Sequence, residues 1–408
     1  MIAERSAKPP RNHCARQAPS PFHPARPRAR NIMANPLFWI NTGEPSGDMH
    51  GALLLKALRA IEPRASFIGM GGNALQRAGM ETLFRVEDLS VMGITEVLGH
   101  LPKIFRMLGD IKAALAGVRP SAVIVIDAPE FHFRVIRAAR ELGIPVYYYI
   151  SPKIWAWREK RALFIRENVR RLISILPFEQ DFYRRFGMEI DYVGNPLIDM
   201  VDYPALQSVP VEQGLVGFLP GSRKKEISSL LPQFGGAARI LRQRLPSLRF
   251  ICVRAPGIDQ ALLEQHWPDD VPVEFMAPEN RWQLMRRCEM LIAASGTVTL
   301  ESAIAGTPTL IAYKVSPFSF AVGKALVKVP FIGLPNLIMG HSVFPELLQK
   351  DCDAVPLADA ALRWLLPQRG TNPLEAVRGE LDEVRRRLGE PGAANRAARV
   401  IADDLAAL

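Results

Sequence analysis

A carboxylate follows one of the most apolar stretches of the 408-residue sequence. Residues 122–126 read AVIVI, which is typical of a buried strand, and Asp127 comes directly after them. In parallel α/β folds, catalytic and binding side chains gather at the carboxyl ends of strands. Asp127 is therefore suited to act as a general base, and it is equally suited to cap the helix predicted after it. His132 follows closely and is a candidate partner, although a single histidine is more often structural.

Four glycine-containing turns at predicted strand ends are candidates for phosphate binding. In each, small residues let the backbone turn closely, and the N–H groups and dipole at a helix start favour an anion. The turns are residues 43–48 (GEPSGD), 69–72 (GMGG), 219–226 (LPGSRKKE) and 294–301 (ASGTVTLE). Any one alone could be an ordinary turn. The two in the second half make a stronger case, because Arg223 can bind two phosphate oxygens at once.

Other cofactor signatures are incomplete. The third glycine of a dinucleotide fingerprint would fall at Ala74, and no GxxxxGK[ST] motif occurs. The sequence DCD at residues 351–353 has no supporting histidine, which disfavours a metal site. Glu301, four residues after Thr297, is placed either to accept hydrogen bonds from a ribose diol or to face solvent.

Short apolar runs alternate with helical patterns along most of the chain, which indicates parallel sheets in an α/β fold. The predicted strands form two sets, at residues 38–41, 67–70, 122–127, 146–150, 172–176 and 190–193, and at 216–219, 250–253, 273–275, 290–294 and 309–313. Between the sets, three prolines interrupt a polar stretch, residues 195–210, that we interpret as a linker. We therefore predict two Rossmann-like domains, 34–200 and 211–345, facing a ligand cleft, followed by C-terminal helices over 346–408.

The net charge of +10 is unevenly distributed. Residues 1–33 contain seven basic residues and one acidic residue, so six of the ten net charges lie there. This segment is rich in proline and has no apolar period. It is a misassigned start with Met33 as the true first residue, a disordered basic tail, or a nucleic-acid-binding arm. The last is least favoured because Phe22 is its only aromatic residue, and we expect no nucleic-acid partner.

Cysteine usage and apolar runs indicate the compartment. The four cysteines are scattered without a CxxC pair, which favours a reduced, cytosolic protein. No run reaches ~18 uncharged apolar residues, so no helix is expected to span a bilayer. Two apolar segments that carry cations, residues 91–108 and 318–329, either pack in the core or touch a membrane surface. The candidates for membrane contact are Val91, Met92, Val97, Leu98, Ile104 and Phe105.

Six motifs stand in order along the chain: GE·SGD (43–48), VMGITEVL (91–98), SPKIWAWR (151–158), LPGSR (219–223), SGT···E (295–301) and LPNL (334–337). Together they resemble the lipid-A-disaccharide synthase family, inverting glycosyltransferases of GT-B architecture. The resemblance runs from about Trp39 to the end of the chain. It implies transfer of 2,3-diacylglucosamine from its UDP derivative to 2,3-diacylglucosamine 1-phosphate, giving the β-1,6-linked lipid A disaccharide 1-phosphate and UDP.

The resemblance also implies the setting of the reaction. It implies a cytoplasmic protein, peripheral at the inner face of the inner membrane, with an anionic lipid surface as partner. It implies no metal and no other cofactor, and it leaves room for a homodimer.

Site residues follow by matching position. The resemblance gives Asp127 the role of general base and makes Arg223 and Asn336 polar groups that are critical for activity. It places the UDP part of the donor against Gly221, Ser222, Arg223, Ser295, Gly296, Thr297 and Glu301. It places the acceptor near Glu44, Ser46 and Asp48. Two positions depart from the family: His132 stands where asparagine is frequent, and Asn195 follows Gly194 where histidine is common.

Two other functions are compatible with these motifs. A related GT-B enzyme that joins another UDP-sugar to a lipid acceptor would share the loops of the second domain. A non-catalytic lipid- or nucleotide-binding protein would bind UDP without releasing UDP from an acylated donor.

Overall fold

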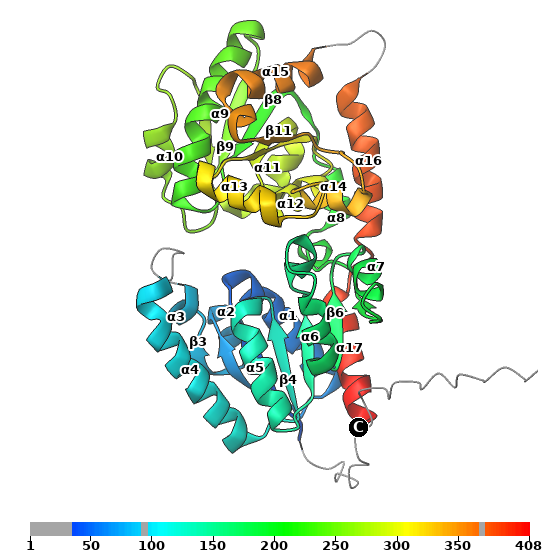
Figure 1. The fold of residues 1–408 in the computed structure, drawn as a ribbon. Helices are drawn as coiled ribbons and strands as arrows, with labels where there is room; N and C mark the ends of the chain where they lie inside the picture. Colours follow the sequence, from blue (N-terminus) through cyan, green and yellow to red (C-terminus); the bar gives the residue numbers. More distant parts are fainter. Residues whose placement is uncertain (1–34, 91–96, 367–371) are drawn as a thin grey trace, which may run out of the picture. The chain divides into compact units, whose positions relative to one another are not determined.

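The computed structural model describes residues 35–90, 97–366 and 372–408. Within these residues the chain builds two sheets whose strands all run parallel, each flanked by helices (Figure 1). We call residues 35–200 and 393–407 the first lobe, and residues 203–366 and 372–388 the second lobe. The two parallel sheets confirm the predicted fold class.

The first sheet has seven strands in the order β3-β2-β1-β4-β5-β6-β7. Its strands are β1 (Leu37–Thr42), β2 (Ser66–Gly71), β3 (Glu81–Arg85), β4 (Ala122–Ile126), β5 (Val146–Tyr149), β6 (Arg171–Ser174) and β7 (Asp191–Tyr192). The helices of this lobe are α1 (Pro45–Ile61), α2 (Asn73–Arg77), α3 (Glu87–Ser90), α4 (Val97–Val118), α5 (Pro129–Glu141), α6 (Arg161–Asn168), α7 (Glu179–Arg184) and α17 (Ala393–Ala406), with short 3-10 turns η1 (Lys153–Ala156) and η2 (Ile198–Met200).

The side chains of β4 point alternately to the two faces of the first sheet, and helices cover both faces. All five residues of β4 are fully buried. Val123 and Val125 pack with apolar residues of α4 and α5 on one face, and Ile124 and Ile126 pack with α1 and α17 on the other. Since successive side chains of a strand point to opposite faces, an unbroken apolar run is what a sheet covered on both sides requires.

The second sheet has six strands in the order β10-β9-β8-β11-β12-β13. They are β8 (Glu212–Leu219), β9 (Arg249–Val253), β10 (Glu274–Met276), β11 (Cys288–Ala294), β12 (Thr309–Tyr313) and β13 (Glu346–Leu348). The helices are α8 (Tyr203–Gln207), α9 (Lys224–Arg244), α10 (Gln260–His266), α11 (Arg281–Arg287), α12 (Thr297–Ala305), α13 (Pro317–Leu326), α14 (Leu334–Met339), α15 (Ala354–Leu365) and α16 (Pro373–Arg387), with turns η3 (Pro278–Asn280) and η4 (Gln349–Cys352). Helices α9 and α15 pack together on one face of this sheet.

The predicted C-terminal helical segment, residues 346–408, is divided between the lobes. It begins with β13, which pairs with β12. Helix α15 packs on α9, and α16 contacts α12 and α14 of the second lobe. The chain then returns, and α17 packs on α1 of the first lobe; in Figure 1 the red α17 lies beside blue and green elements.

The predicted strands coincide with observed ones, and two observed strands were not predicted. These are β3 (ETLFR) and β13 (ELL), which both lie at sheet edges and are only partly buried. The predicted linker, residues 195–210, contains η2 and α8. In the part of the chain that the structure describes, no helix is both long and apolar enough to cross a membrane.

Candidate active site

A cavity of about 980 Å³ lies at the carboxyl ends of the strands of both sheets. From the first lobe it is lined by Glu44, Ser46, Asp127, Lys153 and Trp155. From the second lobe it is lined by the loop after β8, the start of α12, one face of α13 and Glu346. We call this cavity the cleft. The chain therefore brings residues predicted for the donor and for the acceptor to one site.

Asp127 faces the cleft from the end of β4. Its carboxylate does not cap α5, because Ala128 is the N-cap of that helix and no side chain bonds to its first N–H groups. Both Asp127 and Ala128 have positive φ angles, 60° and 42°, a region that favours glycine. Gly43 leaves the space that this turn occupies. A Cβ at residue 43 would overlap the Cβ of Ala128.

Charged groups of both lobes act on the carboxyl group of Glu44. Although it is accessible from the cleft, burial by surrounding atoms raises the pKa of its carboxyl group, and the charge of Asp127 raises it further. Lys153 and Arg223 act in the opposite direction on the same pKa. Two carboxylates and two cations thus influence one another within the cleft. Lys153 belongs to the SPKIWAWR motif, but the sequence alone gave it no assigned role.

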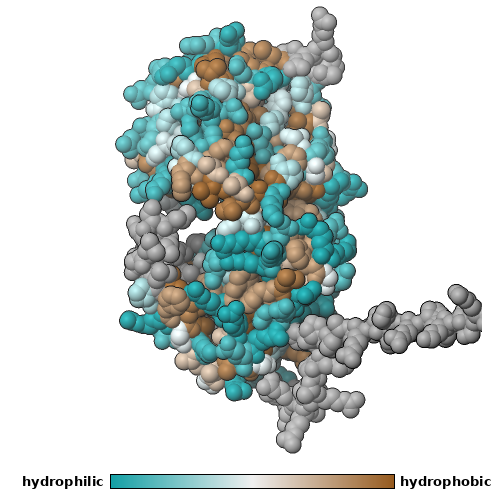
Figure 2. Space-filling model, in the orientation of Figure 1, coloured by the Kyte–Doolittle hydropathy of each residue, from teal (hydrophilic) through white to brown (hydrophobic). Residues whose placement is uncertain are grey.

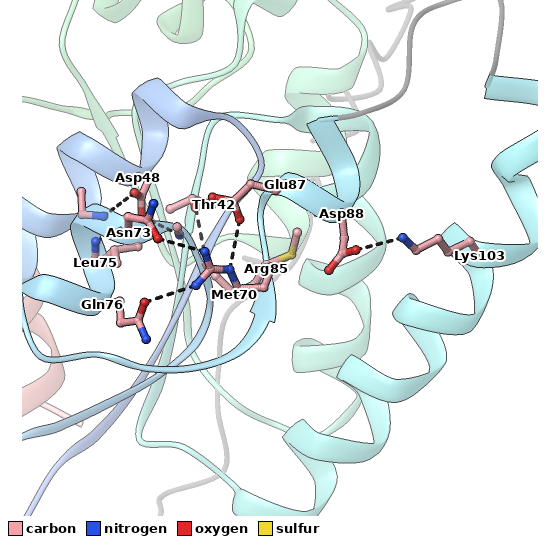
Figure 3. A network of polar contacts seen from close by, with 12 residues as sticks. Thr42, Asp48, Met70, Asn73, Leu75, Gln76, Arg85, Glu87, Asp88 and Lys103 are labelled. Carbon is pink, nitrogen blue, oxygen red and sulfur yellow. Dashed lines mark hydrogen bonds and ion pairs between the residues drawn. The ribbon is translucent and has the colours of Figure 1, made fainter. Parts of the chain in front are cut away.

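Asp48, which was predicted for the acceptor side, does not line the cleft, and its carboxylate bonds to the backbone at the start of α2. Its carboxylate is buried and accepts hydrogen bonds from the N–H groups of Gly72 (2.7 Å), Ala74 (2.8 Å) and Leu75 (3.2 Å). Figure 3 shows the Asp48 side chain directed at the start of α2. The glycine turn at 69–72 does bind an anion, but that anion is the protein's own carboxylate.

The loop after β8 presents Gly221, Ser222 and Arg223 to the cleft. Gly221 has φ 106° and lies so close to the Glu226 carboxylate that a Cβ would overlap it. The N–H group of Ser222 donates to Glu226 (3.1 Å). That N–H group therefore already has an acceptor, and the exposed guanidinium of Arg223 is the charged group that this loop offers to a ligand.

The start of α12 forms another wall of the cleft. Ser295, Gly296 and Thr297 line it, and Glu301 lies one turn further along the helix. Glu301 is not a solvent-facing acid: its side chain is 12% exposed, and its Oε2 accepts from Nε of Arg281 at 2.7 Å. Arg281 itself lines the cleft and was not predicted, because the partner it needs is twenty residues away on another helix.

Asn336 is fully buried and does not line the cleft. Its amide donates to the carbonyl of Phe344 and to Glu346 (both 2.8 Å), and it accepts from the N–H groups of Val343 (2.9 Å) and Phe344 (2.8 Å). All hydrogen-bonding positions of the amide are occupied. One of its partners, Glu346, does line the cleft, so Asn336 contacts the cleft lining through Glu346.

The two departures from the family, His132 and Asn195, are both buried outside the cleft. His132 bonds to the backbone carbonyl of Asp127 rather than to its carboxylate, and burial lowers the pKa of its imidazole to about 4. Asn195 bonds to the backbone of Ile175 and Leu197. His132 is therefore a neutral, structural neighbour of the candidate base.

The predicted membrane residues are only partly covered by the structure. Val91 and Met92 lie outside the described residues, and Val97 and Leu98 fall at the start of α4. Further along α4, Ile104 is half-buried and Phe105 is 54% exposed. Among the residues that the structure describes, no group of three His, Cys, Asp or Glu side chains is arranged to hold a metal ion.

Solved structures with the same arrangement define the class of this fold. The glycotransferase of kitacinnamycin superimposes with a TM-score of 0.63 at 15% identity, over 91% of this chain and 99% of that chain. The UDP-GlcNAc 2-epimerase of Methanocaldococcus jannaschii, solved in complex with UDP-GlcNAc and UDP, gives 0.57 at 14% identity, over 90% and 99%. The fold is that of the GT-B class, which glycosyltransferases and epimerases share.

Sequence comparison identifies the family within this class. A family model described as lipid-A-disaccharide synthetase matches residues 38–380. The lipid-A-disaccharide synthase of Myxococcus xanthus (strain DK1622) is 39% identical over 377 residues, which cover 90% of this chain and 97% of that relative. The enzyme of the same name from Syntrophotalea carbinolica (strain DSM 2380 / NBRC 103641 / GraBd1) is 38% identical over 374 residues, 89% and 94%. The chain belongs to the lipid-A-disaccharide synthase family of UDP-sugar glycosyltransferases, as its motifs indicated.

Proposed function

We propose that this chain transfers 2,3-diacylglucosamine from its UDP derivative to the 6-hydroxyl of 2,3-diacylglucosamine 1-phosphate. The products are the β-1,6-linked disaccharide 1-phosphate of lipid A and UDP. Family membership supports the reaction. The observation that carries the assignment of roles is that Asp127 and Arg223, from different lobes, line one cleft.

The chemistry needs a base on one side of the anomeric carbon and charge stabilisation on the other. Asp127 accepts the proton of the acceptor hydroxyl as that oxygen attacks the anomeric carbon. The bond from this carbon to the β-phosphate oxygen breaks at the same time, so UDP leaves from the opposite face and the centre is inverted. Glu44 and Ser46, beside Asp127 in the cleft, are placed to orient the acceptor.

The leaving diphosphate is stabilised by cations and by a helix start. Arg223 and the N-terminal turn of α12 meet its charge, and Glu301, held by Arg281, accepts hydrogen bonds from the ribose. The proposal calls on no metal ion. We therefore expect the rate to be unchanged after dialysis against EDTA, whereas a loss of rate that magnesium restores would contradict this part of the proposal.

The acyl chains of both substrates place the reaction at an anionic lipid surface, the cytoplasmic face of the inner membrane. Helix α13 has an exposed apolar side that includes Phe318 (80% exposed), Val322 and Leu326, spaced four residues apart. Figure 2 shows apolar residues gathered in this part of the second lobe. Residues 314–345 contain three lysines and no acidic residue; Lys314 pairs with Asp353 and Lys328 with Glu159, and Lys324 lies on α13 itself. Apolar insertion beside cations suits anionic head groups.

Vesicle binding tests this membrane surface. We expect the protein to sediment with phosphatidylglycerol vesicles more than with phosphatidylcholine vesicles. Phe105→Ser and Phe318→Ser should each weaken that binding. Val355→Ser is the matched control, because Val355 is also an exposed apolar residue (59%) but lies on α15, outside both segments. If all three variants bound the vesicles equally well, neither α4 nor α13 would be part of the membrane-binding surface.

The reaction itself is tested by incubating the protein with both acylated glucosamine substrates and detecting the disaccharide by mass spectrometry. A parallel incubation replaces the acceptor with an undecaprenyl-linked one, which tests the alternative that a different lipid is glycosylated. Product from the diacylglucosamine 1-phosphate alone supports the proposal. Binding of UDP without any product from either acceptor would favour a non-catalytic protein.

A further inference from the structure

The peptide between Asp127 and Ala128 is held in a conformation that neither residue favours. Both φ angles are positive, and neither residue is a glycine. Such a backbone persists only where surrounding groups over-determine it. The question is therefore which groups hold this peptide, because its orientation sets the direction of the Asp127 side chain.

Two buried donors converge on the carbonyl oxygen of Asp127. Nδ1 of His132 lies 2.6 Å from it, and the hydroxyl group of Tyr148 donates to it at 2.9 Å. His132 projects from α5 and Tyr148 from β5, and both side chains are fully buried. One carbonyl oxygen is thus fixed from two different elements.

The direction of the hydrogen bonds in this cluster can be read from Trp39. The indole N–H group of Trp39 is only a donor, so Oδ1 of Asn41, 3.1 Å away, must be the acceptor. The NH₂ group of Asn41 then faces Nε2 of His132 at 3.0 Å and Sδ of Met70 at 3.7 Å. Nε2 must accept this bond. The proton of the neutral imidazole therefore sits on Nδ1, where it donates to Asp127.

We propose that His132 is a positioning residue for the transfer reaction, held in its Nδ1–H tautomer by the carbonyl oxygen of Asp127 at Nδ1 and by the amide of Asn41 at Nε2. Together with Tyr148 it fixes the carbonyl of Asp127 and so directs the carboxylate into the cleft. The positioning role rests on the proposed function of Asp127 as the base. The tautomer does not, because it follows from the hydrogen bonds alone.

Nitrogen NMR tests the tautomer without any substrate. In protein labelled with ¹⁵N-histidine, the signals that His132→Asn removes are those of His132. At pH 7.5 we expect Nδ1 to have the chemical shift of a protonated nitrogen and Nε2 that of an unprotonated one. Trp39→Phe leaves the carbonyl oxygen of Asp127 in place, and because that oxygen can only accept, the variant should keep the proton on Nδ1. A protonated Nε2 in the unchanged chain would overturn the proposal.

Steady-state kinetics tests the positioning role. His132→Asn keeps an N–H donor at about the place of Nδ1 and should retain kcat within about threefold. His132→Leu and Tyr148→Phe each remove one donor. Because small misplacements of a reacting group cost up to about 100-fold in rate, we expect each to lower kcat by about 10–100-fold with KM changed less than about twofold.

The two variants also separate positioning from general damage to the fold. Tyr148→Phe changes no volume beyond one hydroxyl group, so it should fold even if His132→Leu does not. Thermal unfolding of each variant is measured beside its rate. A folded Tyr148→Phe with normal kcat, or a His132→Leu as active as His132→Asn, would overturn the positioning role while leaving the proposed function intact. Absence of product from the unchanged chain would instead overturn the proposed function and the positioning role with it.

Discussion

Asp127 is the residue on which the proposed chemistry depends. It faces the cleft at the end of β4, and the turn that presents it is held by buried neighbours. Asp127→Asn keeps the size of the side chain but removes the base. We expect kcat to fall about 100-fold or more, with an unchanged melting temperature. The exposed Asp359 on α15 provides a matched control, and Asp359→Asn should keep full activity. Near-normal turnover by a folded Asp127→Asn would exclude it as the base.

Arg223 is the second residue whose loss should be severe. Its exposed guanidinium lines the cleft at the start of α9, where it can meet the charge that develops on the leaving diphosphate. We expect Arg223→Ala to lower kcat/KM for the UDP donor about 100-fold or more. Arg242→Ala, at the far end of the same helix, is the control. Equal kinetics for the two variants would place the diphosphate elsewhere.

The roles of single residues could be predicted only in part, because some side chains bond to partners that are distant in the sequence. Asp127, Arg223 and Glu301 were found because strand ends and helix starts can be recognised from local patterns. Asp48 was predicted for the acceptor side and Asn336 as critical for activity, whereas in the structure Asp48 bonds to residues 72–75 and Asn336 to residues 343–346. Nothing near Asp48 in the sequence shows that its carboxylate is already used.

At the scale of elements, the turns after β1 and β4 depend on each other. Gly43 follows β1, and a Cβ there would overlap the Cβ of Ala128 after β4. We expect Gly43→Ala to lower stability and kcat together. Ala128→Gly should relieve the overlap, and glycine also tolerates the positive φ of that position.

A double-mutant cycle measures this dependence. The double variant Gly43→Ala/Ala128→Gly should be more stable than Gly43→Ala alone by about 0.5–3 kcal/mol, the usual range for coupled neighbours. Denaturant unfolding of the four proteins provides the numbers. Additive effects of the two substitutions would mean that the turns do not interact.

Helix α7 and the turn η1 are joined by a buried acid. Glu179, the first residue of α7, accepts hydrogen bonds from the indole of Trp155 (2.9 Å) and from the hydroxyl group of Ser174. Burial raises the pKa of its carboxyl group to about 7. The folded protein therefore binds this proton more tightly than the unfolded chain, whose pKa is near 4.5. The stabilising contribution is complete below about pH 4.5 and is lost as the pH rises through 7.

Replacing Glu179 should remove that dependence on pH. We expect the melting temperature of the unchanged protein to fall relative to that of Glu179→Gln between pH 5 and pH 8, since each pKa unit corresponds to about 1.4 kcal/mol. Thermal unfolding of both proteins at unit steps of pH is the measurement. Parallel curves would show that Glu179 does not titrate in this range.

Most of the strands could be predicted from the sequence, but two edge strands could not. Strands such as β4 and β11 were found because both faces are covered, which requires continuous apolar runs. The edge strands β3 and β13 were missed because neither is a continuous apolar run: both begin with a glutamate, and only Leu347 among their residues is buried. The C-terminal helices were predicted as one segment, because periodicity indicates a helix but not the lobe that it covers.

For the whole molecule, the return of the chain to the first lobe has an energetic consequence. Ile401 of α17 is fully buried among Leu54, Leu58 and other residues of α1 and the first sheet. We expect Ile401→Ala to destabilise the protein by about 2–4 kcal/mol through the cavity it leaves. Asn395→Asp, an exposed change on the same helix, should be nearly neutral. Urea unfolding followed by circular dichroism compares them, and equal midpoints would mean that α17 contributes little.

The position of α17 also sets an order of events during synthesis. The ribosome makes residues 393–406 after every strand of both sheets, although this helix covers a face of the sheet that was made first. The residues of α1 that pack against α17 stay without this cover until the last residues of the chain have been made. The lobe that carries Asp127 therefore completes its core only when the end of the chain is available.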